Sequence, residues 1–159
     1  MIRRLSALRL VSVVVALAGG FAVGCGDDDT EVASVVTGPP SFSIDSPSDG
    51  DCVVLHDDPG MSIRVRISVE NWLLRPFGYC GTQYQQCGYA VFSVDDTELV
   101  RSASRVTDVP FAEQPTPGGA HRLKVELRND VDVVVLDADG EPLLRGIDVV
   151  TVVPDDTCG

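Results

Sequence analysis

The sequence has few of the residues and motifs on which enzymes and metal sites depend. It contains two histidines in 159 residues and no Cys-x-x-Cys pair, so a zinc site is not expected. It also lacks a nucleophile elbow, a phosphate-binding loop, a dinucleotide fingerprint and a His-Glu-x-x-His motif. We therefore expect a protein without catalytic activity, with a small secreted enzyme that uses a pair of carboxylates as the alternative.

Positive charge is scarce as well. The 24 Asp and Glu residues all follow residue 24, whereas three of the 12 Lys and Arg residues precede it. The chain after residue 24 thus carries nine basic and 24 acidic residues, a net charge of −15. Such a chain repels nucleic acid, so nucleic-acid binding is not expected. Because no basic patch is available, membrane association would have to come from acyl chains.

No hydrophobic run is long enough to cross a membrane. The run "LVSVVVALA" at 10–18 has about half of the roughly 20 residues that a spanning helix needs. It follows Arg3, Arg4 and Arg9 and is followed by small residues. Positive, apolar and small residues in this order predict that residues 1–24 are a cleaved signal peptide.

The segment "AVGC" at 22–25 resembles the lipobox of bacterial lipoproteins. In that family, processing exposes the cysteine as the new N-terminus, and its thiol and amine are acylated. The resemblance implies lipidation of Cys25 and a membrane-anchored protein of the cell envelope, on the inner or the outer membrane. Residues 25–41, which are acidic and end in Pro39-Pro40, would form the tether. Because Ala22-x-Gly24 also suits ordinary signal peptidase, a secreted or periplasmic protein with a spare thiol is the alternative.

From residue 42 onward the hydrophobic pattern has a period of two. In "SIRVRISVE" (62–70), "YAVFSVDD" (89–96) and "HRLKVELR" (121–128), every second residue is apolar, which is typical of strands with one buried face. The residues expected to face the core are Ile63, Val65, Ile67, Val69, Ala90, Phe92, Val94, Leu123, Val125 and Leu127. Shorter strands are expected at 42–45, 52–55 and 98–106, and residues 131–153 read as a hairpin about Asp139-Gly140. The expected fold is an antiparallel immunoglobulin- or fibronectin-like β-sandwich of about seven strands over residues 42–159.

Several segments together carry a family resemblance. "FSIDSPSDGDCV", "VRISVENW", "CGTQYQQCGYAVFSVDD", "PGGAHRLKVELRND" and "LDADGEPLLRGIDVVTV" cover most of residues 42–153. They are similar to the immunoglobulin-like domain of envelope lipoproteins found in myxobacteria and their relatives. The resemblance implies a single, non-catalytic sandwich domain behind a lipidated cysteine.

Cysteine usage points to an oxidising compartment. Besides Cys25 there are four cysteines, an even number that can form two disulfides. Cys80 and Cys87 flank a short loop and are the favoured pair, which leaves Cys52 and Cys158 to join the C-terminal tail to an early strand. Since four cysteines allow three pairings, the sequence leaves the connectivity open.

Aromatic residues are few but clustered. Six of the nine lie between residues 72 and 92, around the loop that Cys80 and Cys87 flank. We expect Trp72 and Phe92 to lie in the core. Phe77, Tyr79 and Tyr84 are the candidate contacts for a partner, an envelope protein or a glycan.

Acidic turns raise the question of calcium. Asp137 and Asp139 in "DADGE" match only part of a calcium loop, which needs oxygen donors at alternate positions over about twelve residues. Asp130 would join them if the two hairpin ends were adjacent. A calcium- or glycan-binding surface is therefore the alternative function, whereas a plain turn at Gly140 explains the same residues without a metal.

Overall fold

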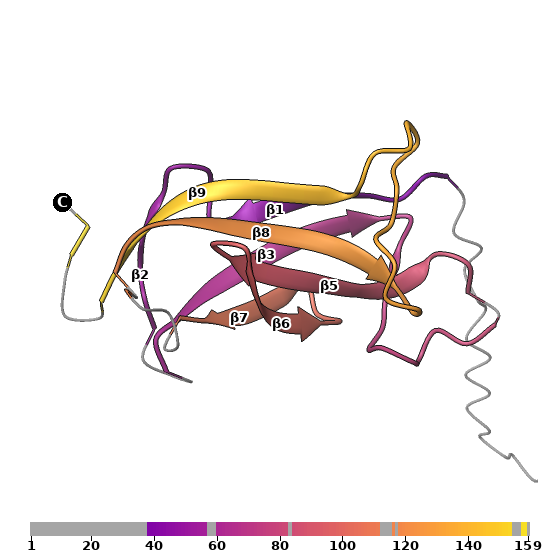
Figure 1. Ribbon diagram of the computed structural model, residues 1–159, viewed down its shortest axis with the longest axis horizontal. Helices are drawn as coiled ribbons and strands as arrows, with labels where there is room; N and C mark the ends of the chain where they lie inside the picture. Colours follow the sequence, from indigo (N-terminus) through magenta and orange to yellow (C-terminus); the bar gives the residue numbers. More distant parts are fainter. Residues whose placement is uncertain are drawn as a thin grey trace, which may run out of the picture. The chain divides into compact units, whose positions relative to one another are not determined.

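The computed structural model of the protein describes residues 38–56, 60–82, 84–111, 116, 118–153 and 157–158. The expected signal peptide, Cys25 and most of the tether lie outside these residues. Within them the chain forms strands and no helix (Figure 1). This part of the chain therefore contains no helix that could cross a membrane. The strands are β1 (Ser41–Ser46), β2 (Cys52–Val54), β3 (Ser62–Glu70), β4 (Leu73–Leu74), β5 (Cys87–Val94), β6 (Thr97–Ser102), β7 (Val106–Pro110), β8 (Gly119–Asn129) and β9 (Leu144–Val152).

The strands form two sheets. One has the order β1-β3-β7, and the other has the order β2-β9-β8-β5-β4, with β6 also paired to β5 (Figure 1). Most neighbours are antiparallel, and the parallel pairs are β2 with β9 and β4 with β5. The expected all-β, mainly antiparallel sandwich is confirmed.

Alternation builds the core between the sheets. Burial in β3 and β8 follows the expected period of two, and all ten side chains expected to face inward are buried. They form one hydrophobic cluster with residues of both sheets, which includes Trp72 and Phe92 as expected. Burial of this apolar surface is the main force that holds the two sheets together.

Strand β5 is buried on both faces, unlike a strand with one wet side. Its inward side chains reach the core, while Tyr89 and Val91 point outward and are still at most 2% exposed. Their cross-strand neighbours on β8 are Arg128 and Glu126, and Arg101 on β6 lies opposite Val91. Long charged side chains on both flanking strands thus cover the outer face of β5.

A disulfide fixes the end of the chain to the early strand β2. Cys52 and Cys158 are joined with a Cα–Cα distance of 5.8 Å, the pairing that the sequence favoured. Beside this bridge, β2 runs parallel to β9 with Cys52 opposite Val150. Sequence alternation did not indicate this parallel pairing, because it joins segments about 100 residues apart.

The strand expected at 98–106 is two strands. β6 pairs with β5 in one sheet, and β7 pairs with β3 in the other. Between them, the hydroxyl of Ser102 accepts a hydrogen bond from Ser104 N–H, and that of Ser104 accepts one from Val106 N–H. Serine side chains thus replace ladder hydrogen bonds where the chain crosses between the sheets.

The first arm of the expected 131–153 hairpin is not a strand. Residues 131–143 make only isolated bridges, Arg128 with Val134 and Leu136 with Pro142. The chain turns tightly after β8, with Asp132 at a φ of 63°, and Pro142 has no N–H with which to extend the ladder. The turn itself is present, with Gly140 at a φ of 84°.

Several connections meet at one end of the sandwich, which we call the loop end. It comprises residues 71–82, 84–87, 102–105 and 129–143, together with residues 38–40 that lead into β1. Gln86 donates a hydrogen bond to the Gly38 carbonyl at 2.8 Å, and Asn71 donates one to the Pro39 carbonyl at 3.1 Å. Strand β2, to which Cys158 is joined through Cys52, lies at the opposite end (Figure 1).

Candidate functional site

The loop at 75–87, which carries the predicted contact residues, contains a second disulfide. Tyr84 lies within the ring that this disulfide closes, and Phe77 and Tyr79 directly precede it. Cys80 and Cys87 are joined with a Cα–Cα distance of 5.6 Å, again the favoured pairing. The loop is also attached to the sheet, because Arg75 N–H donates to the Gly88 carbonyl at 2.7 Å. Its shape is therefore fixed at both ends.

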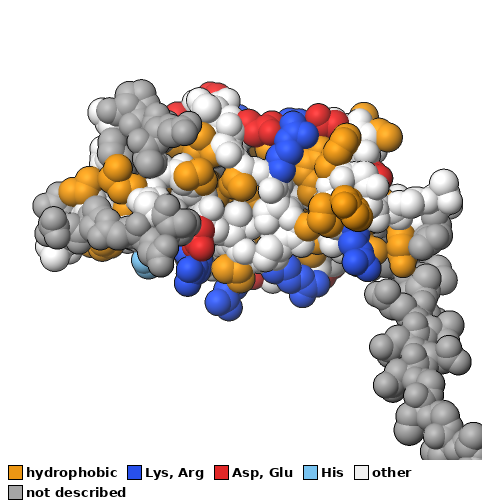
Figure 2. Space-filling view, turned by 90° about the horizontal axis from the view of Figure 1, so that it is seen from below, with side chains coloured by type: hydrophobic (Ala, Val, Ile, Leu, Met, Phe, Trp, Pro, Cys, Tyr) orange, Lys and Arg blue, Asp and Glu red, His pale blue; other side chains and the backbone are white. Residues whose placement is uncertain are grey.

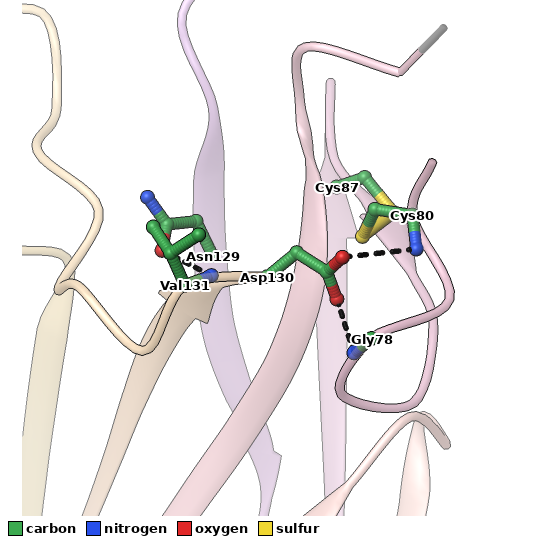
Figure 3. Close-up of a disulfide and its surroundings, with 6 residues drawn as sticks. All are labelled: Gly78, Cys80, Cys87, Asn129, Asp130 and Val131. Atoms are coloured by element: carbon green, nitrogen blue, oxygen red, sulfur yellow. Dashed lines mark hydrogen bonds between the residues drawn. A yellow bond between two sulfur atoms is a disulfide. The ribbon is translucent and has the colours of Figure 1, made fainter. Parts of the chain in front are cut away.

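Asp130 attaches this loop to the segment that follows β8. Its carboxylate accepts a hydrogen bond from Gly78 N–H at 2.5 Å and one from Cys80 N–H at 3.4 Å (Figure 3). The neighbouring Asn129 accepts hydrogen bonds from Val131 N–H and Val133 N–H through its side-chain oxygen. Two segments about 50 residues apart in the sequence thus hold each other in position.

The three predicted contact residues differ in exposure. Phe77 is 57% exposed and Tyr79 is 74% exposed, whereas Tyr84 is half-buried. The Phe77 ring also packs edge-on against Tyr89, with 5.9 Å between the ring centroids. Phe77 and Tyr79 are thus the two that stand open at the surface.

A shallow cleft of about 400 Å³ lies beside Phe77. It is lined by Pro76, Phe77, Tyr89, Arg101 and residues 102–104, two of which are serines. Aromatic rings, hydroxyls and a guanidinium can stack on and hydrogen-bond to a polar ligand. Tyr89 and Arg101 line this cleft, although the sequence analysis did not predict them as contact residues. They lie on different strands, and their proximity depends on the pairing of those strands.

Tyr89 is the centre of a charged network behind the cleft. Its hydroxyl donates to Asp132 at 2.5 Å, and Arg101 donates to that hydroxyl at 3.3 Å. Arg128 also reaches the Asp132 carboxylate, at 3.1 Å. Burial raises the pKa of Tyr89, and the hydrogen bond to Asp132 adds to the shift, to about 12. The hydrogen bonds from Tyr89 and Arg128 lower the pKa of Asp132.

Exposed hydrophobic side chains gather at the loop end. Of the eight large ones that are exposed in the described part of the chain, five lie on its segments. We call these five the apolar end patch: Phe77, Tyr79, Val131, Val133 and Leu136. Figure 2 shows one face of the molecule, on which hydrophobic side chains reach the surface in several places among Lys and Arg side chains. Clustering of this kind marks contact surfaces more often than scattered exposed residues do.

The weak calcium candidates are not brought together. Asp130 is bound to the disulfide loop, and Asp137 accepts hydrogen bonds from Asp139 N–H and Glu141 N–H within its own turn. Among the residues that the structure describes, no group of three or more His, Cys, Asp or Glu side chains could hold a metal ion. The turn about Gly140 is thus explained by its own hydrogen bonds.

His121 lies at the other end of the sandwich. Its Nδ1 is 2.6 Å from Asp95 in the β5–β6 turn, its ring packs edge-on against Phe111, and it is 6% exposed. Asp95 also accepts a hydrogen bond from Arg122 N–H at 2.9 Å. Burial raises the pKa of Asp95, but the hydrogen bonds from Arg122 and His121 outweigh it, so the pKa lies below its ordinary value. These contacts attach the turn between β5 and β6 to strand β8.

Together these features define a small, disulfide-bonded β-sandwich with a rigid loop end. The sequence matches no family model and no curated protein. Two solved structures are similar to the fold. Fibronectin(III)-like modules of Clostridium thermocellum CbhA have 16% identity and a TM-score of 0.42, with 73% of this chain and 99% of that chain covered.

The other structure is the endo-beta-1,4-mannanase from Thermotoga petrophila, with 16% identity and a TM-score of 0.40. The match covers 71% of this chain and 20% of the mannanase, so the present chain corresponds to about a fifth of that enzyme's length. The fold class itself rests on the strand order and the shared core.

Proposed function

We propose that the protein is a lipid-anchored, non-catalytic β-sandwich of the cell envelope that acts as a structural or binding module. The observation that carries this proposal is the distribution of the cysteines. Two disulfides account for four of the five, and Cys25, which follows "AVG", is left for another role. Acylation supplies that role.

The compartment follows from the same bonds. Disulfides form and persist outside the reducing cytoplasm, so the two bridges indicate an extracytoplasmic domain. A signal peptide over residues 1–24 would deliver the chain there. The acidic segment that follows Cys25 would then connect the acyl chains to the domain.

The hydrogen bonds and the pKa of the polar groups in the cleft support binding rather than catalysis. Arg101 is bound to Glu98 at 2.6 Å and to the Tyr89 hydroxyl. Tyr89 itself holds its proton more tightly than a free tyrosine, whereas a general acid or base works best with a pKa near neutrality. Groups in this state suit the positioning of a ligand.

The test is membrane fractionation of cells that produce the full chain. Cys25→Ala removes the only thiol available for acylation, so we expect the protein to move from the membrane fraction to the soluble fraction. Thr30→Ala, a change of similar size in the same segment, should leave it in the membrane fraction. Retention of the Cys25→Ala variant in the membrane fraction would contradict the proposal.

A glycan is the second candidate partner, favoured by the aromatic rings beside the cleft. Phe77 is exposed, and the cleft next to it adds Arg101 and serine hydroxyls, groups that stack on and hydrogen-bond to sugars. Phe77→Ala should lose affinity for soluble envelope glycan fragments while remaining folded, with only the small loss of stability that comes from its edge-on contact with Tyr89. Val54→Ala at a distant surface should keep the affinity. Equal affinity of both variants would remove this candidate.

A further inference from the structure

We propose that the apolar end patch rests on the lipid–water interface of the membrane that holds the protein, so that the domain stands on its loop end. This inference rests on the proposed anchoring at Cys25. It assigns the patch one occupant, the lipid surface itself, and gives the domain a defined orientation with the Cys52–Cys158 bridge directed away from the membrane.

The tether joins the domain at its loop end. Gly38 and Pro39 are held by Gln86 and Asn71, so the chain that leads back to Cys25 leaves from the loop end. Residues 25–37 number 13 and can extend at most about 45 Å. The 11 residues of β8 add about 36 Å to the far end. The loop end is therefore the part of the domain that the tether holds nearest to the membrane, at the highest effective concentration.

The side chains of the apolar end patch are of the kinds that enter a membrane interface. It combines two aromatic rings with three aliphatic side chains, all more than half exposed. Tyrosine is enriched at membrane interfaces because its ring is apolar and its hydroxyl remains in contact with water. Apolar side chains of this kind enter the boundary between head groups and acyl chains.

The two ends of the sandwich differ in the basic residues beside them. The loop end contains two arginines and five acidic residues, and two further arginines, Arg101 and Arg128, directly border its segments. At the opposite end, segments 47–51, 94–97, 119–122 and 146–151 contain one arginine and five aspartates. An acidic surface is repelled by anionic head groups. Because Arg101 and Arg128 border the loop end and offset part of its negative charge, the loop end is repelled less than the opposite end.

Covalent and hydrogen bonds hold the loop end together. The Cys80–Cys87 disulfide directly follows Phe77 and Tyr79, and Asp130 attaches Gly78 and Cys80 to the segment that carries Val131 and Val133. Because these side chains are already held at one surface, contact with lipid orders few additional groups.

The test uses the mature acylated protein in phosphatidylcholine vesicles whose acyl chains carry bromine, a contact quencher of tryptophan emission. Tyr79→Trp places a reporter in the patch, and Val54→Trp places one at an exposed position of β2 near the opposite end. The native Trp72 is 7% exposed within the core and supplies a constant background. We expect the emission added by Tyr79→Trp to be largely lost in brominated vesicles, and that added by Val54→Trp to be retained.

Flotation of the wild-type protein with the vesicles separates the two proposals. If the protein floats and Tyr79→Trp is not quenched more than Val54→Trp, the orientation is wrong and the anchor stands. If the protein does not float, the anchor fails and the orientation fails with it. Val133→Trp is a second reporter in case Tyr79→Trp disturbs the fold. Capture of a glycan or an envelope protein by a photo-crosslinker at position 79, without quenching in vesicles, would assign the patch to that occupant instead.

Discussion

The carboxylate of Asp130 accepts a hydrogen bond of 2.5 Å from the backbone N–H of Gly78. Together with the contact to Cys80 N–H, it fixes the disulfide loop against the segment that follows β8 (Figure 3). The two exposed aromatic residues, Phe77 and Tyr79, lie on either side of Gly78. Their position at the surface thus depends on an aspartate about 50 residues away.

We therefore expect Asp130→Ala to loosen the loop end. Loss of hydrogen bonds to a charged, partly exposed acceptor should lower the free energy of unfolding by about 1–2 kcal/mol. Amide hydrogen exchange at Gly78 and Cys80 should accelerate more than exchange in β8. Asp139→Ala, which leaves the Asp130 contacts intact, is the control. Unchanged exchange at Gly78 in the Asp130 variant would show that the contact does not order the loop.

The two disulfides should differ in their contribution to stability. The Cys52–Cys158 bridge spans 106 residues and the Cys80–Cys87 bridge spans seven. Chain entropy predicts that replacing the first pair by serine lowers the free energy of unfolding by about 4–5 kcal/mol, and replacing the second by about 2–3 kcal/mol. Chemical denaturation of the two double variants measures this order. A larger loss for the short loop would mean that native contacts, and not chain entropy, dominate.

Tyr89 should titrate at unusually high pH. Its pKa is raised to about 12, first by burial and then by the hydrogen bond to Asp132. A folded-state pKa above the usual value of about 10 means that this stabilisation is complete below pH 10 and is lost as the pH rises towards 12.

Absorbance of the phenolate measures that titration. Tyr79→Phe with Tyr84→Phe leaves Tyr89 as the remaining tyrosine of the chain. In that background, Asp132→Asn should bring the pKa down towards 10, because it removes the charged acceptor while burial persists. A Tyr89 pKa near 10 while Asp132 is unchanged would contradict the prediction that burial and the hydrogen bond to Asp132 raise it.

The Asp95 contact predicts acid sensitivity. Its folded-state pKa is lowered, since the hydrogen bonds from Arg122 and His121 outweigh the effect of burial. The contact thus stabilises the fold fully above the unfolded pKa of about 3.9, and its contribution is lost as the pH falls through the lower folded value. Urea unfolding between about pH 5 and about pH 2 measures this effect. The free energy of unfolding of Asp95→Asn should decline less steeply with falling pH than that of the wild type. Asp139→Asn should follow the wild type.

Alternation of apolar residues was enough to predict the strands at the centre of both sheets. Burial of one face is a local property of "SIRVRISVE" and "HRLKVELR", and the structure follows it in β3 and β8. The arm at 131–136 also reads as apolar, but Asp132 and Pro142 prevent it from forming a ladder. A pattern of side chains does not show where backbone pairing stops.

The site was less predictable than the strands. The exposed ring of Tyr79 could be expected from its place directly before the short loop that Cys80 and Cys87 close. The pairing of Tyr89 with Asp132 and Arg101 could not, because it depends on how β5, β6 and the segment after β8 meet in space. The sequence carries no local signal for contacts of that range.

Intact mass spectrometry of the protein extracted from membranes tests the central claim most directly. The account predicts a mature N-terminus at Cys25, a mass increase from acyl chains on that residue, and two disulfides that together lose four hydrogens relative to the reduced chain. A chain that begins at another residue, or an unmodified Cys25, would contradict it.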